Sequence, residues 1–477
     1  MTQISRLALA CCAALLAAVS PAAGAVGPNY RQPYISLTPT YLSGPMTGVA
    51  GAPSGAWWDS FNDPVLTWVV AQALAENLDV RRAQARLLQA RAQAGGAGAA
   101  LLPLGEATGG VSDTSQSLVS PIGALLHHLP GFERQFDQYQ LGTQASWDID
   151  LFGGLSRERQ SAVAQANASA ADLAAVRVNI AADSADAYLQ IRAFQARIAV
   201  TQRQEGIQQD LLALVRRRAA QGVASDRETH EAAAILEGVQ AGLPPLNAGL
   251  QAQFNRLDVL MGAQPGAWRA RLSTPADIPS APSVASAGGP AALLRRRPDV
   301  VAAEQRMIAA NASVGADIAD YYPKISISGL LGVNSIYASQ IFTGSALESQ
   351  IGAGLRWRLF DFGRVDAEVA QARGRYAESL AAWRGAVLQG ASEVEAAFSD
   401  LAERQARAKV LVRQIDDLEA ARRQAQQAYE AGVISLIEVR DADRELLIAS
   451  DQLAQTRADA DRAAVAAFRA LGGGWIS

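Results

Sequence analysis

The sequence predicts a mixed α+β fold built from two copies of one unit. Segments of alternating apolar and polar residues occur in pairs, as expected of β-strands with one apolar face. Each pair precedes about 65 residues without proline, which favours a long helix. The pattern recurs about 210 residues later, and an internal repeat of this kind constrains the architecture before any single element is assigned.

The chain begins with a segment typical of secretory signal peptides. Arg6 precedes an apolar run and a small-residue cleavage site that ends at Ala25. The run is too short to cross a bilayer as a helix. We therefore expect residues 1–25 to be removed, and with them Cys11 and Cys12. A mature chain without cysteine has no disulfide, no thiol chemistry and no cysteine metal site.

Composition excludes several classes of protein. The 477 residues carry a net charge of −4 and are 18% charged, so no basic excess points to nucleic acid. No later stretch offers 18 consecutive apolar residues, which excludes a transmembrane helix. The three histidines show no metal-ligand spacing, and no nucleophile–base pair or phosphate loop occurs. We expect no enzyme activity, no metal and no cofactor.

The elements follow the same order in both repeats. Residues 26–56 form an extended arm, and the proline-rich residues 263–297 link the repeats at 57–262 and 298–474. In the first repeat we expect strands at about 103–113 and 138–151 and long helices at about 154–218 and 226–262, the latter kinked at Pro244-Pro245. In the second we expect strands at about 324–334 and 350–360 and long helices at about 364–430 and 435–471.

Matched positions define the spacing of the repeat. Pro103 and Pro323 lie 220 positions apart, whereas Trp147 and Trp357 lie 210 positions apart, a spacing that persists to the end of the repeat. The extra ten residues therefore belong to the loop between the two strands, where insertions cost little free energy.

The strands have one apolar and one polar face. In the stretch 324–334, isoleucine, leucine and valine alternate with serine, glycine and asparagine. Helices of roughly 100 Å extend far beyond four strands, so most of their length cannot cover the apolar face. Lipid suits that face and a water-filled lumen suits the polar one, with Trp147 and Trp357 near the membrane–water boundary.

Four strands cannot close a barrel around a lumen, and open sheet edges are prohibitively costly in lipid. We therefore expect other copies of the chain to complete the barrel. The alternative is a water-soluble sheet that the helices cover. Between Leu380 and Ile415 an apolar residue recurs every seven positions, which predicts coiled-coil packing of the long helix.

Several segments, spread over nearly the whole mature chain, resemble the TolC-like outer-membrane factors of tripartite efflux pumps, in their NodT-type lipoprotein branch. They are "VGPNYRQP" (26–33), "WWDSFNDPVL" (57–66), "LLRRRPDVVAAEQR" (293–306), "YYPKISISG" (321–329), "RLFDFGR" (358–364), "YEAGVISLIEVRDADREL" (429–446) and "FRALGGGW" (468–475).

The resemblance implies a passive exit duct in the outer membrane of a Gram-negative bacterium, extending into the periplasm. It implies a homotrimer with a twelve-stranded β-barrel and a long α-helical barrel. The expected partners are outer-membrane lipid, a periplasmic adaptor (membrane fusion) protein and an inner-membrane pump of the RND type, with no nucleic acid. Gly24 stands where this branch usually carries its lipid-bearing cysteine, so we expect no acyl anchor.

Two other functions stay open at this point. A type I protein secretion system uses an outer-membrane duct of the same fold, and a passive tunnel takes its substrate from its pump. A periplasmic coiled-coil scaffold or adaptor without a pore also has long helical hairpins. The strand pairs that flank the hairpins in both repeats favour a duct over a scaffold.

The hairpins turn at two similar sequences. The turn residues are Gly222, Val223 and Ser225 in the first repeat and Gly432, Val433 and Ser435 in the second. Glycine suits a tight turn with positive φ. The resemblance implies that these tips also contact the adaptor.

The segment after the second turn holds the expected periplasmic aperture. By resemblance, Asp441 and Ile437 constrict the pore, and Arg440 and Arg444 lie near enough in sequence to offset the repulsion among three carboxylates. Arg440 and Asp443 depart from the family pattern, which more often has an apolar residue and an amide there. The alternative is a solvated, charged helix face.

Overall fold

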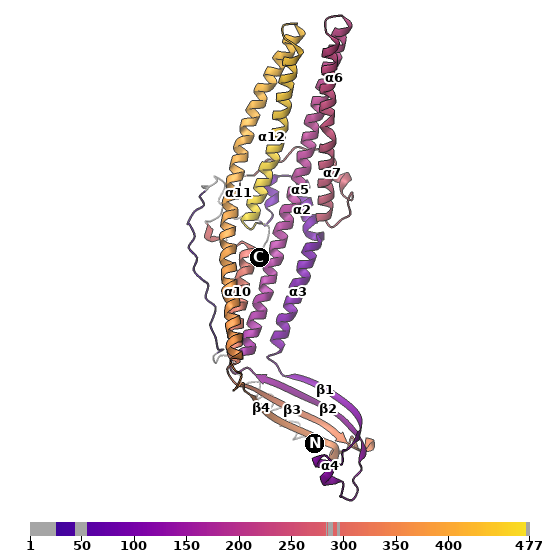
Figure 1. Ribbon diagram of the computed structural model, residues 1–477, viewed down its shortest axis with the longest axis vertical. Helices are drawn as coiled ribbons and strands as arrows, with labels where there is room; N and C mark the ends of the chain where they lie inside the picture. Colours follow the sequence, from indigo (N-terminus) through magenta and orange to yellow (C-terminus); the bar gives the residue numbers. More distant parts are fainter. Residues whose placement is uncertain (1–24, 43–54, 283, 285–289, 293–295, 474–477) are drawn as a thin grey trace. The chain divides into compact units, whose positions relative to one another are not determined.

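The computed structural model describes residues 25–42, 55–282, 284, 290–292 and 296–473 (Figure 1). Residues 1–24 of the expected signal peptide and residues 43–54 of the expected arm lie outside the described residues. The described chain divides into two compact units. The first contains the described residues up to Pro33, Leu88–Asn167 and Glu304–Ala381; the second contains the remainder. Each unit therefore draws on both sequence repeats.

The first unit contains a four-stranded antiparallel sheet with strand order β1-β2-β3-β4. The strands are β1 (Leu104–Ser115), β2 (Gln135–Ile149), β3 (Lys324–Ser335) and β4 (Leu347–Arg356). The short α4 (Pro121–Leu126) lies in the longer loop between β1 and β2, and the 3-10 turns η3 (Ala338–Gln340) and η4 (Gly344–Ala346) lie between β3 and β4.

The two hairpins of the sheet have the same register. Leu104 lies opposite Ser146 in the first hairpin, and Lys324 lies opposite Arg356 in the second. These positions differ by 220 and 210, the spacings found in the sequence. We expected the last strand to reach about residue 360, but β4 ends at Arg356, and among the described residues no strand pairs with its outer edge.

The helices of the first unit include α10 (Pro298–Ala319), most of α3 (Leu78–Ala99) and the beginnings of α5 (Gly154–Ala220) and α11 (Arg364–Glu430). The start of the arm is fixed against α5. The backbone N–H of Val26 donates to the Phe152 carbonyl (3.0 Å), and buried Arg157 donates to the Val26 carbonyl (3.2 Å) and to Asn29 (2.8 Å).

The second unit has the larger apolar core. Its elements, besides the continuations of α5 and α11, are η1 (Trp57–Phe61), α2 (Pro64–Glu76), α6 (Asp226–Ala241), α7 (Leu243–Leu260), α8 (Arg269–Leu272), η2 (Pro290–Ala292) and α12 (Leu436–Ala470). Trp57 stacks on Phe468 with ring centroids 5.1 Å apart. Val387, Val394 and Leu401, which belong to the seven-residue repeat of α11, are buried.

The helices that return from the two tips differ. The helix expected over residues 226–262 is divided at Gly242 into α6 and α7, whereas α12 is continuous. Pro244 and Pro245 lie in the first turn of α7, where proline needs no backbone donor, so the chain restarts a helix instead of continuing one.

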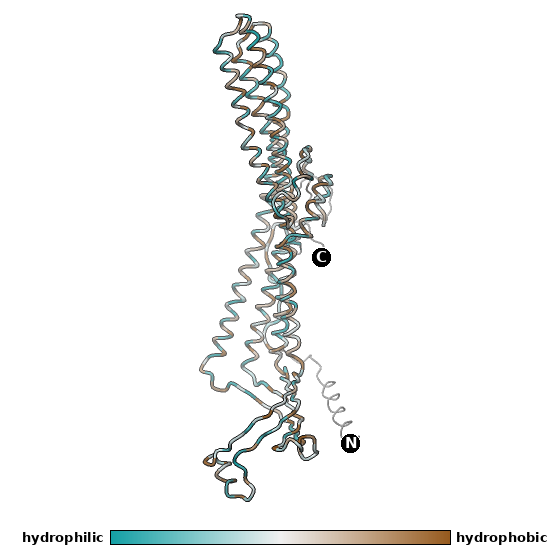
Figure 2. Tube along the Cα trace, turned by 90° about the vertical axis from the view of Figure 1, so that its right-hand side faces the viewer, coloured by the Kyte–Doolittle hydropathy of each residue, from teal (hydrophilic) through white to brown (hydrophobic). Residues whose placement is uncertain are grey.

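Among the described residues, none of the helices combines the length and the apolar character that a membrane span requires. Figure 2 shows apolar and polar residues interspersed along the long helices.

Candidate functional site: sheet faces, hairpin tips and aperture segment

The apolar face of the sheet is exposed. The register places Trp147 opposite Ile327, and Ile327 opposite Ala353. The same face continues through Leu331 and Ile351, and the Ile351 side chain is 88% exposed. Within the part of the chain that the structure describes, no helix covers Ile351, which argues against a water-soluble sheet whose apolar face is covered by helices. The exposed Leu331 and Ile351 leave apolar surface on this face that is suited to contact with lipid.

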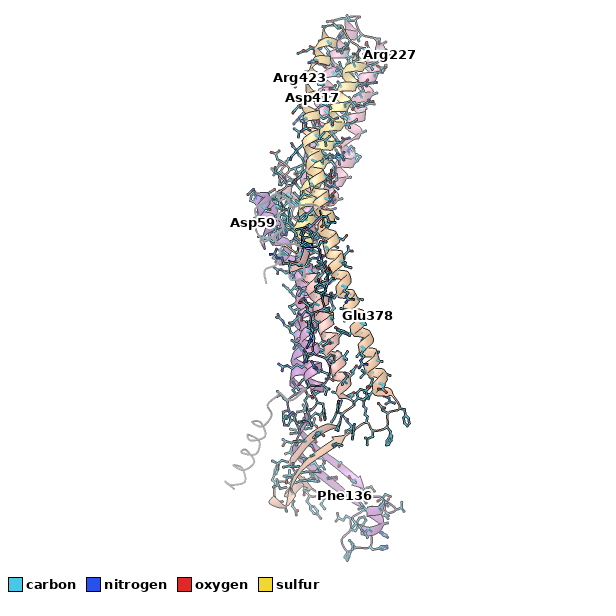
Figure 3. All side chains as sticks on the ribbon, turned by 90° about the vertical axis from the view of Figure 1, so that its left-hand side faces the viewer. Asp59, Phe136, Arg227, Glu378, Asp417 and Arg423 are labelled. Carbon is cyan, nitrogen blue, oxygen red and sulfur yellow. The ribbon has the colours of Figure 1, made fainter. Side chains whose placement is uncertain are left out.

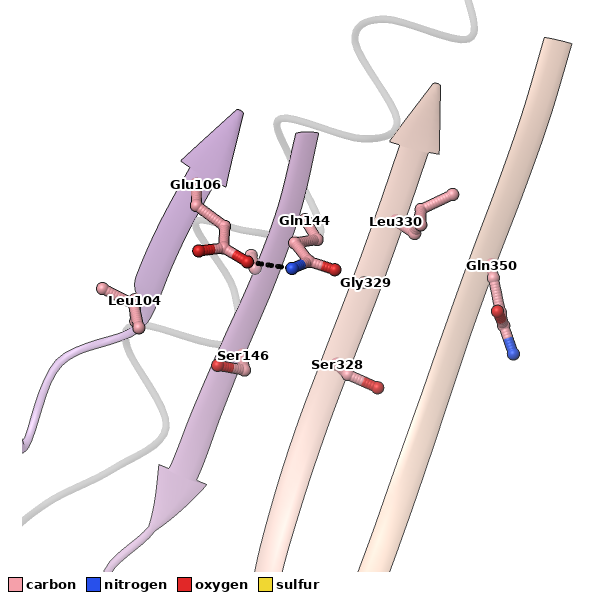
Figure 4. Close-up of a pocket in the computed structure, with 9 residues that line it drawn as sticks. Leu104, Glu106, Gln144, Ser146, Ser328, Gly329, Leu330 and Gln350 are labelled. Carbon is pink, nitrogen blue, oxygen red and sulfur yellow. Dashed lines mark hydrogen bonds between the residues drawn. The ribbon is translucent and has the colours of Figure 1, made fainter. Parts of the chain in front are cut away.

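The opposite face is polar. Glu106, Gln144, Leu330 and Gln350 lie in one row across the four strands, and the Gln144 amide donates to the Glu106 carboxylate (Figure 4). The row borders an open hollow of about 280 Å³. Its side chains offer hydrogen bonds to water, as the wall of an aqueous passage requires. Leu330 is an apolar exception in this row.

The two tryptophans expected at the membrane boundary occupy equivalent places. The indole N–H of Trp147 donates to the Leu101 carbonyl, and that of Trp357 donates to the Tyr321 carbonyl, each at 3.0 Å. Both acceptors lie two residues before the proline that precedes the next strand, Pro103 or Pro323. Each tryptophan therefore holds the end of its strand segment against a helix–strand corner.

The tips have matching backbone geometry. Gly222 has a φ of 75° and Gly432 a φ of 77°. The N–H of Val223 donates to the Arg218 carbonyl and that of Val433 to the Ala428 carbonyl, both at 2.9 Å, which closes each helix end. Both valine side chains are exposed.

The serines of the tips begin the return helices. Ser225 is the N-cap residue of α6, and its side chain accepts from the Glu228 backbone N–H at 3.3 Å. Ser435 is the N-cap residue of α12, and Glu438 accepts from its backbone N–H at 3.5 Å. The serines thus define where each return helix starts and leave the valines at the end of the tip.

A contact that the sequence analysis missed links the two tips. Arg218, at the end of α5, donates to the Tyr429 carbonyl at 2.9 Å, and its guanidinium lies 4.5 Å from the centre of the Tyr429 ring. Tyr429 is buried in a small apolar cluster with Leu212, Val215 and Val439. The two tips of one chain are therefore held together by both a hydrogen bond and apolar packing.

The expected aperture residues share one face of α12. Ile437, Arg440, Asp441 and Arg444 follow the spacing that places side chains on one side of a helix. Arg440 donates to Asp441 at 3.1 Å, and Arg444 pairs with Glu445 at 3.3 Å. This face is largely open within one chain, so the structure brings the four residues together but leaves their side chains accessible.

Asp443 lies on the opposite, buried face of α12. It is 1% exposed and accepts from Arg422 of α11 at 2.9 Å and from the Gln208 amide of α5 at 3.1 Å. A buried carboxylate with two such donors ties three helices together close to the aperture segment. The departure from the family pattern that the sequence analysis noted at 443 thus corresponds to a buried ion pair.

The repeat spacing of 210 could have revealed this pair. Arg422 corresponds to Leu212, and Asp443 corresponds to Ala233, both of which contribute to the apolar cluster near the first tip. Opposite charges at two positions that are apolar in the other repeat are consistent with a buried ion pair, because buried charges need a partner.

A second buried carboxylate lies further along α12. Asp461 is 1% exposed, and its Oδ2 has no hydrogen-bond partner. Burial raises the pKa of Asp461 to about 8, although Arg457 partly opposes that shift. Among the described residues, no group of three or more histidine, cysteine, aspartate or glutamate side chains is arranged to hold a metal ion.

A sheet with one lipid-compatible and one polar face, joined to paired long helical hairpins, defines a TolC-like outer-membrane channel protein. The family model described as "Outer membrane efflux protein" matches residues 69–263 and 289–473. The chain belongs to this family, and it is an efflux channel of the outer membrane. The family consists of channel proteins.

Curated relatives and solved structures agree with this assignment. The chain is 31% identical to the pyoverdine export outer membrane protein OpmQ of Pseudomonas putida over 89% of each chain. It is 26% identical to nodulation protein T of Rhizobium leguminosarum bv. trifolii over 90% of each. The structure of the outer-membrane channel OprN, 33% identical, superposes with a TM-score of 0.85 and covers 94% of this chain and 99% of its own. These matches confirm the resemblance found in the sequence.

Proposed function

We propose that the chain is the exit duct of a tripartite efflux system and works as a homotrimer. The exposed apolar face of the sheet supports this proposal most directly. One sheet presents lipid-compatible side chains on one face and hydrogen-bonding side chains on the other, but it leaves two strand edges unpaired. Three copies would close twelve strands around an aqueous lumen and leave no edge in lipid.

The hairpin tips are the proposed contact with a periplasmic adaptor. Val223 and Val433 are exposed at the ends of two helical turns that Arg218 and Tyr429 hold at a fixed spacing. A pair of exposed apolar side chains on a rigid support suits docking of another helical hairpin. In this proposal an inner-membrane pump of the RND type supplies the energy for export.

The aperture segment is the proposed closed end of the duct. In a trimer, three copies of Asp441 around a narrow axis would attract cations and repel one another, while three copies of Ile437 would exclude water. The Arg440 side chain beside each Asp441 would reduce that repulsion. The buried Asp443–Arg422 pair would hold this part of α12 against α11 in the closed form.

In this proposal the pump, and not the duct, determines which substrate is exported. The relatives include a pyoverdine export protein and a toluene efflux pump protein, so the family spans different cargo. Protein secretion of the type I kind is the remaining alternative of the same fold, and it would share every wall residue described above.

Reconstitution of the purified protein into planar lipid bilayers tests the proposal. We expect a detergent-requiring trimer that inserts and gives small or rare openings, because the aperture is closed without an adaptor. A protein that stays soluble without detergent and never inserts would contradict the duct and favour a periplasmic scaffold. Cross-linking of a cysteine at Val433 to a co-expressed adaptor, with exposed Val410 on α11 as the control position, tests the tip contact.

A further inference from the structure

The open hollow on the polar face of the sheet has a mixed lining. Its volume of about 280 Å³ is close to the lower limit of small-molecule sites, which span roughly 300–1,000 Å³. The side chains that line it come from all four strands and belong to Leu104, Glu106, Gln144, Ser146, Ser328, Leu330 and Gln350 (Figure 4). The hollow therefore offers charge, hydrogen bonds and apolar surface within one small space.

Glu106 supplies a charge that its neighbours in the sheet do not neutralise. Its carboxylate accepts from the Gln144 amide, which is a neutral donor. Within the four strands, the cationic side chains of this face are Lys324 and Arg356, and each lies six residues from the row that contains Glu106. Six residues span roughly 20 Å along a strand, well beyond the screening length of roughly 8–10 Å in ordinary salt. The hollow therefore attracts cations.

Leu330 supplies apolar surface in a row that is otherwise polar. The other members of the row are Glu106, Gln144 and Gln350. Because β2 separates β1 from β3, Leu330 lies two strand spacings, roughly 9.5 Å, from Glu106. An elongated molecule with a positive charge at one end and an apolar group at the other can contact both side chains.

The internal repeat shows that the fold does not require this lining. The two hairpins have the same register when moved by 220 and 210 positions. The counterpart of Glu106 is Ser326, and the counterpart of Leu330 is Gly110. A small residue suffices at each of these places in the other hairpin. The carboxylate and the leucine are therefore free to serve contact with a passing molecule.

We propose that the hollow is a transient binding site for organic cations that carry an apolar group. This inference rests on the proposed duct, in which the polar face lines the lumen. The ammonium group of such a molecule donates to the Glu106 carboxylate, and its apolar group covers Leu330. Ser146 and Ser328, in the neighbouring row, supply hydroxyl oxygens.

Weak binding suits a duct, because a molecule that passes through must also leave. The hollow is open, so a bound molecule stays partly in water and gains little from each contact. The pump still determines what enters the duct, and the hollow acts on what passes through it.

Block of the channel current in planar bilayers tests the site. The probe is 2-phenylethylammonium, in which a short chain joins an ammonium group to an aromatic ring, added on the extracellular side. We expect half block at roughly millimolar concentration, because one exposed charge pair and a small apolar contact give weak binding. The block should deepen at voltages that drive cations into the lumen. 2-Phenylethanol lacks the charge and ethylammonium lacks the ring, so each should need at least about fivefold higher concentrations.

Two substitutions separate the charge from the apolar contact. Glu106→Gln keeps the shape of the side chain and should raise the half-block concentration of 2-phenylethylammonium about fivefold, to that of 2-phenylethanol. Leu330→Ser should raise the same concentration about threefold or more and leave that of ethylammonium unchanged, because only the ring loses a contact. The matched control is Glu348→Gln. Glu348 lies on the same face of the sheet outside the hollow and accepts from the Asn334 amide at 3.4 Å, so its removal should change the half-block concentration by less than about twofold.

The outcomes separate the site from the duct. Block that is unchanged in Glu106→Gln would place the probe elsewhere in the lumen, and equal loss of block in Glu106→Gln and Glu348→Gln would reflect the general charge of the wall; either result would overturn the site. Unchanged block in Leu330→Ser would overturn the preference for cations with an apolar group. A protein that conducts but is not blocked would overturn the site while the proposed duct stands. A protein that never conducts would overturn the proposed function, and this inference with it.

Discussion

The two helical hairpins differ in what holds their helices together near the tip. In the first hairpin, Leu212 and Ala233 belong to an apolar cluster. In the second, their counterparts Arg422 and Asp443 form a buried ion pair. A buried ion pair adds little net stability over an apolar pair, but it tolerates only one geometry and is costly to break on one side. The second hairpin is therefore held in place by a specific contact and the first by general packing.

The largest expected effect comes from breaking this pair on one side. Arg422→Leu would leave the Asp443 carboxylate buried with only the Gln208 amide as a donor. We expect a loss of roughly 3–5 kcal/mol in the free energy of unfolding, measured by chemical denaturation of the purified protein. The double variant Arg422→Leu with Asp443→Ala reproduces the first hairpin and should lie within about 1 kcal/mol of the natural protein.

The first hairpin supplies the matched control. Leu212→Arg places an unpaired charge in the apolar cluster and should be destabilising to a similar degree, whereas adding Ala233→Asp should recover part of the loss. If the double variants are no more stable than the single ones, the ion pair does not account for the difference between the hairpins.

A smaller effect is expected further along the same helices. Asp461 of α12 corresponds to Gln251 of α7, so a titratable carboxyl group replaces a neutral amide. Because burial raises its pKa to about 8, the folded protein keeps Asp461 protonated at a pH at which the unfolded chain releases that proton. The stability that this group contributes is present below about pH 4 and is lost as the pH rises toward 8.

The variant Asp461→Asn removes this pH dependence. Between pH 4 and pH 8 we expect the free energy of unfolding of the natural protein to fall by about 2–4 kcal/mol relative to the variant. Unfolding curves at several pH values measure the difference, with Gln251→Glu as a comparison in the first hairpin. Parallel curves for Asp461→Asn and the natural protein would show that Asp461 ionises normally in the folded state.

The smallest expected effect is at the tips, where the hairpins are alike. Gly222→Ala and Gly432→Ala each impose a side chain on a positive φ, but an added methyl group meets no atom within 4 Å at either site. We expect each to cost about 1 kcal/mol, from backbone strain alone. A marked difference between the two variants in thermal unfolding would indicate that the tips are not equivalent.

Residue patterns in the sequence made much of the fold predictable. Alternation of apolar and polar residues identified the strands, because it reports which face is buried or lipid-exposed. Long stretches without proline identified α5 and α11, and Pro244-Pro245 marked the division of the first return helix. The end of β4 was placed too late, because the pattern continues through residues that lack a strand partner in a single chain.

The candidate site was less predictable. The turn glycines at the tips were evident from residue type alone, since few residues accept a positive φ. Asp443 was not, because four of the five residues from Arg440 to Arg444 are charged and local pattern alone describes the run as a solvated face. Its burial depends on Arg422, which lies on another helix, and only comparison between the repeats connects the two.

The central claim is that the second hairpin carries the closed aperture of an efflux duct. Single-channel conductance in planar bilayers tests it by comparing Asp441→Ala with Glu231→Ala, the counterpart in the first hairpin, which pairs with Arg227 on α6 (Figure 3 labels Arg227). We predict larger or more frequent openings for Asp441→Ala and natural behaviour for Glu231→Ala. Unchanged conductance in Asp441→Ala, or equal opening in both variants, would contradict the account.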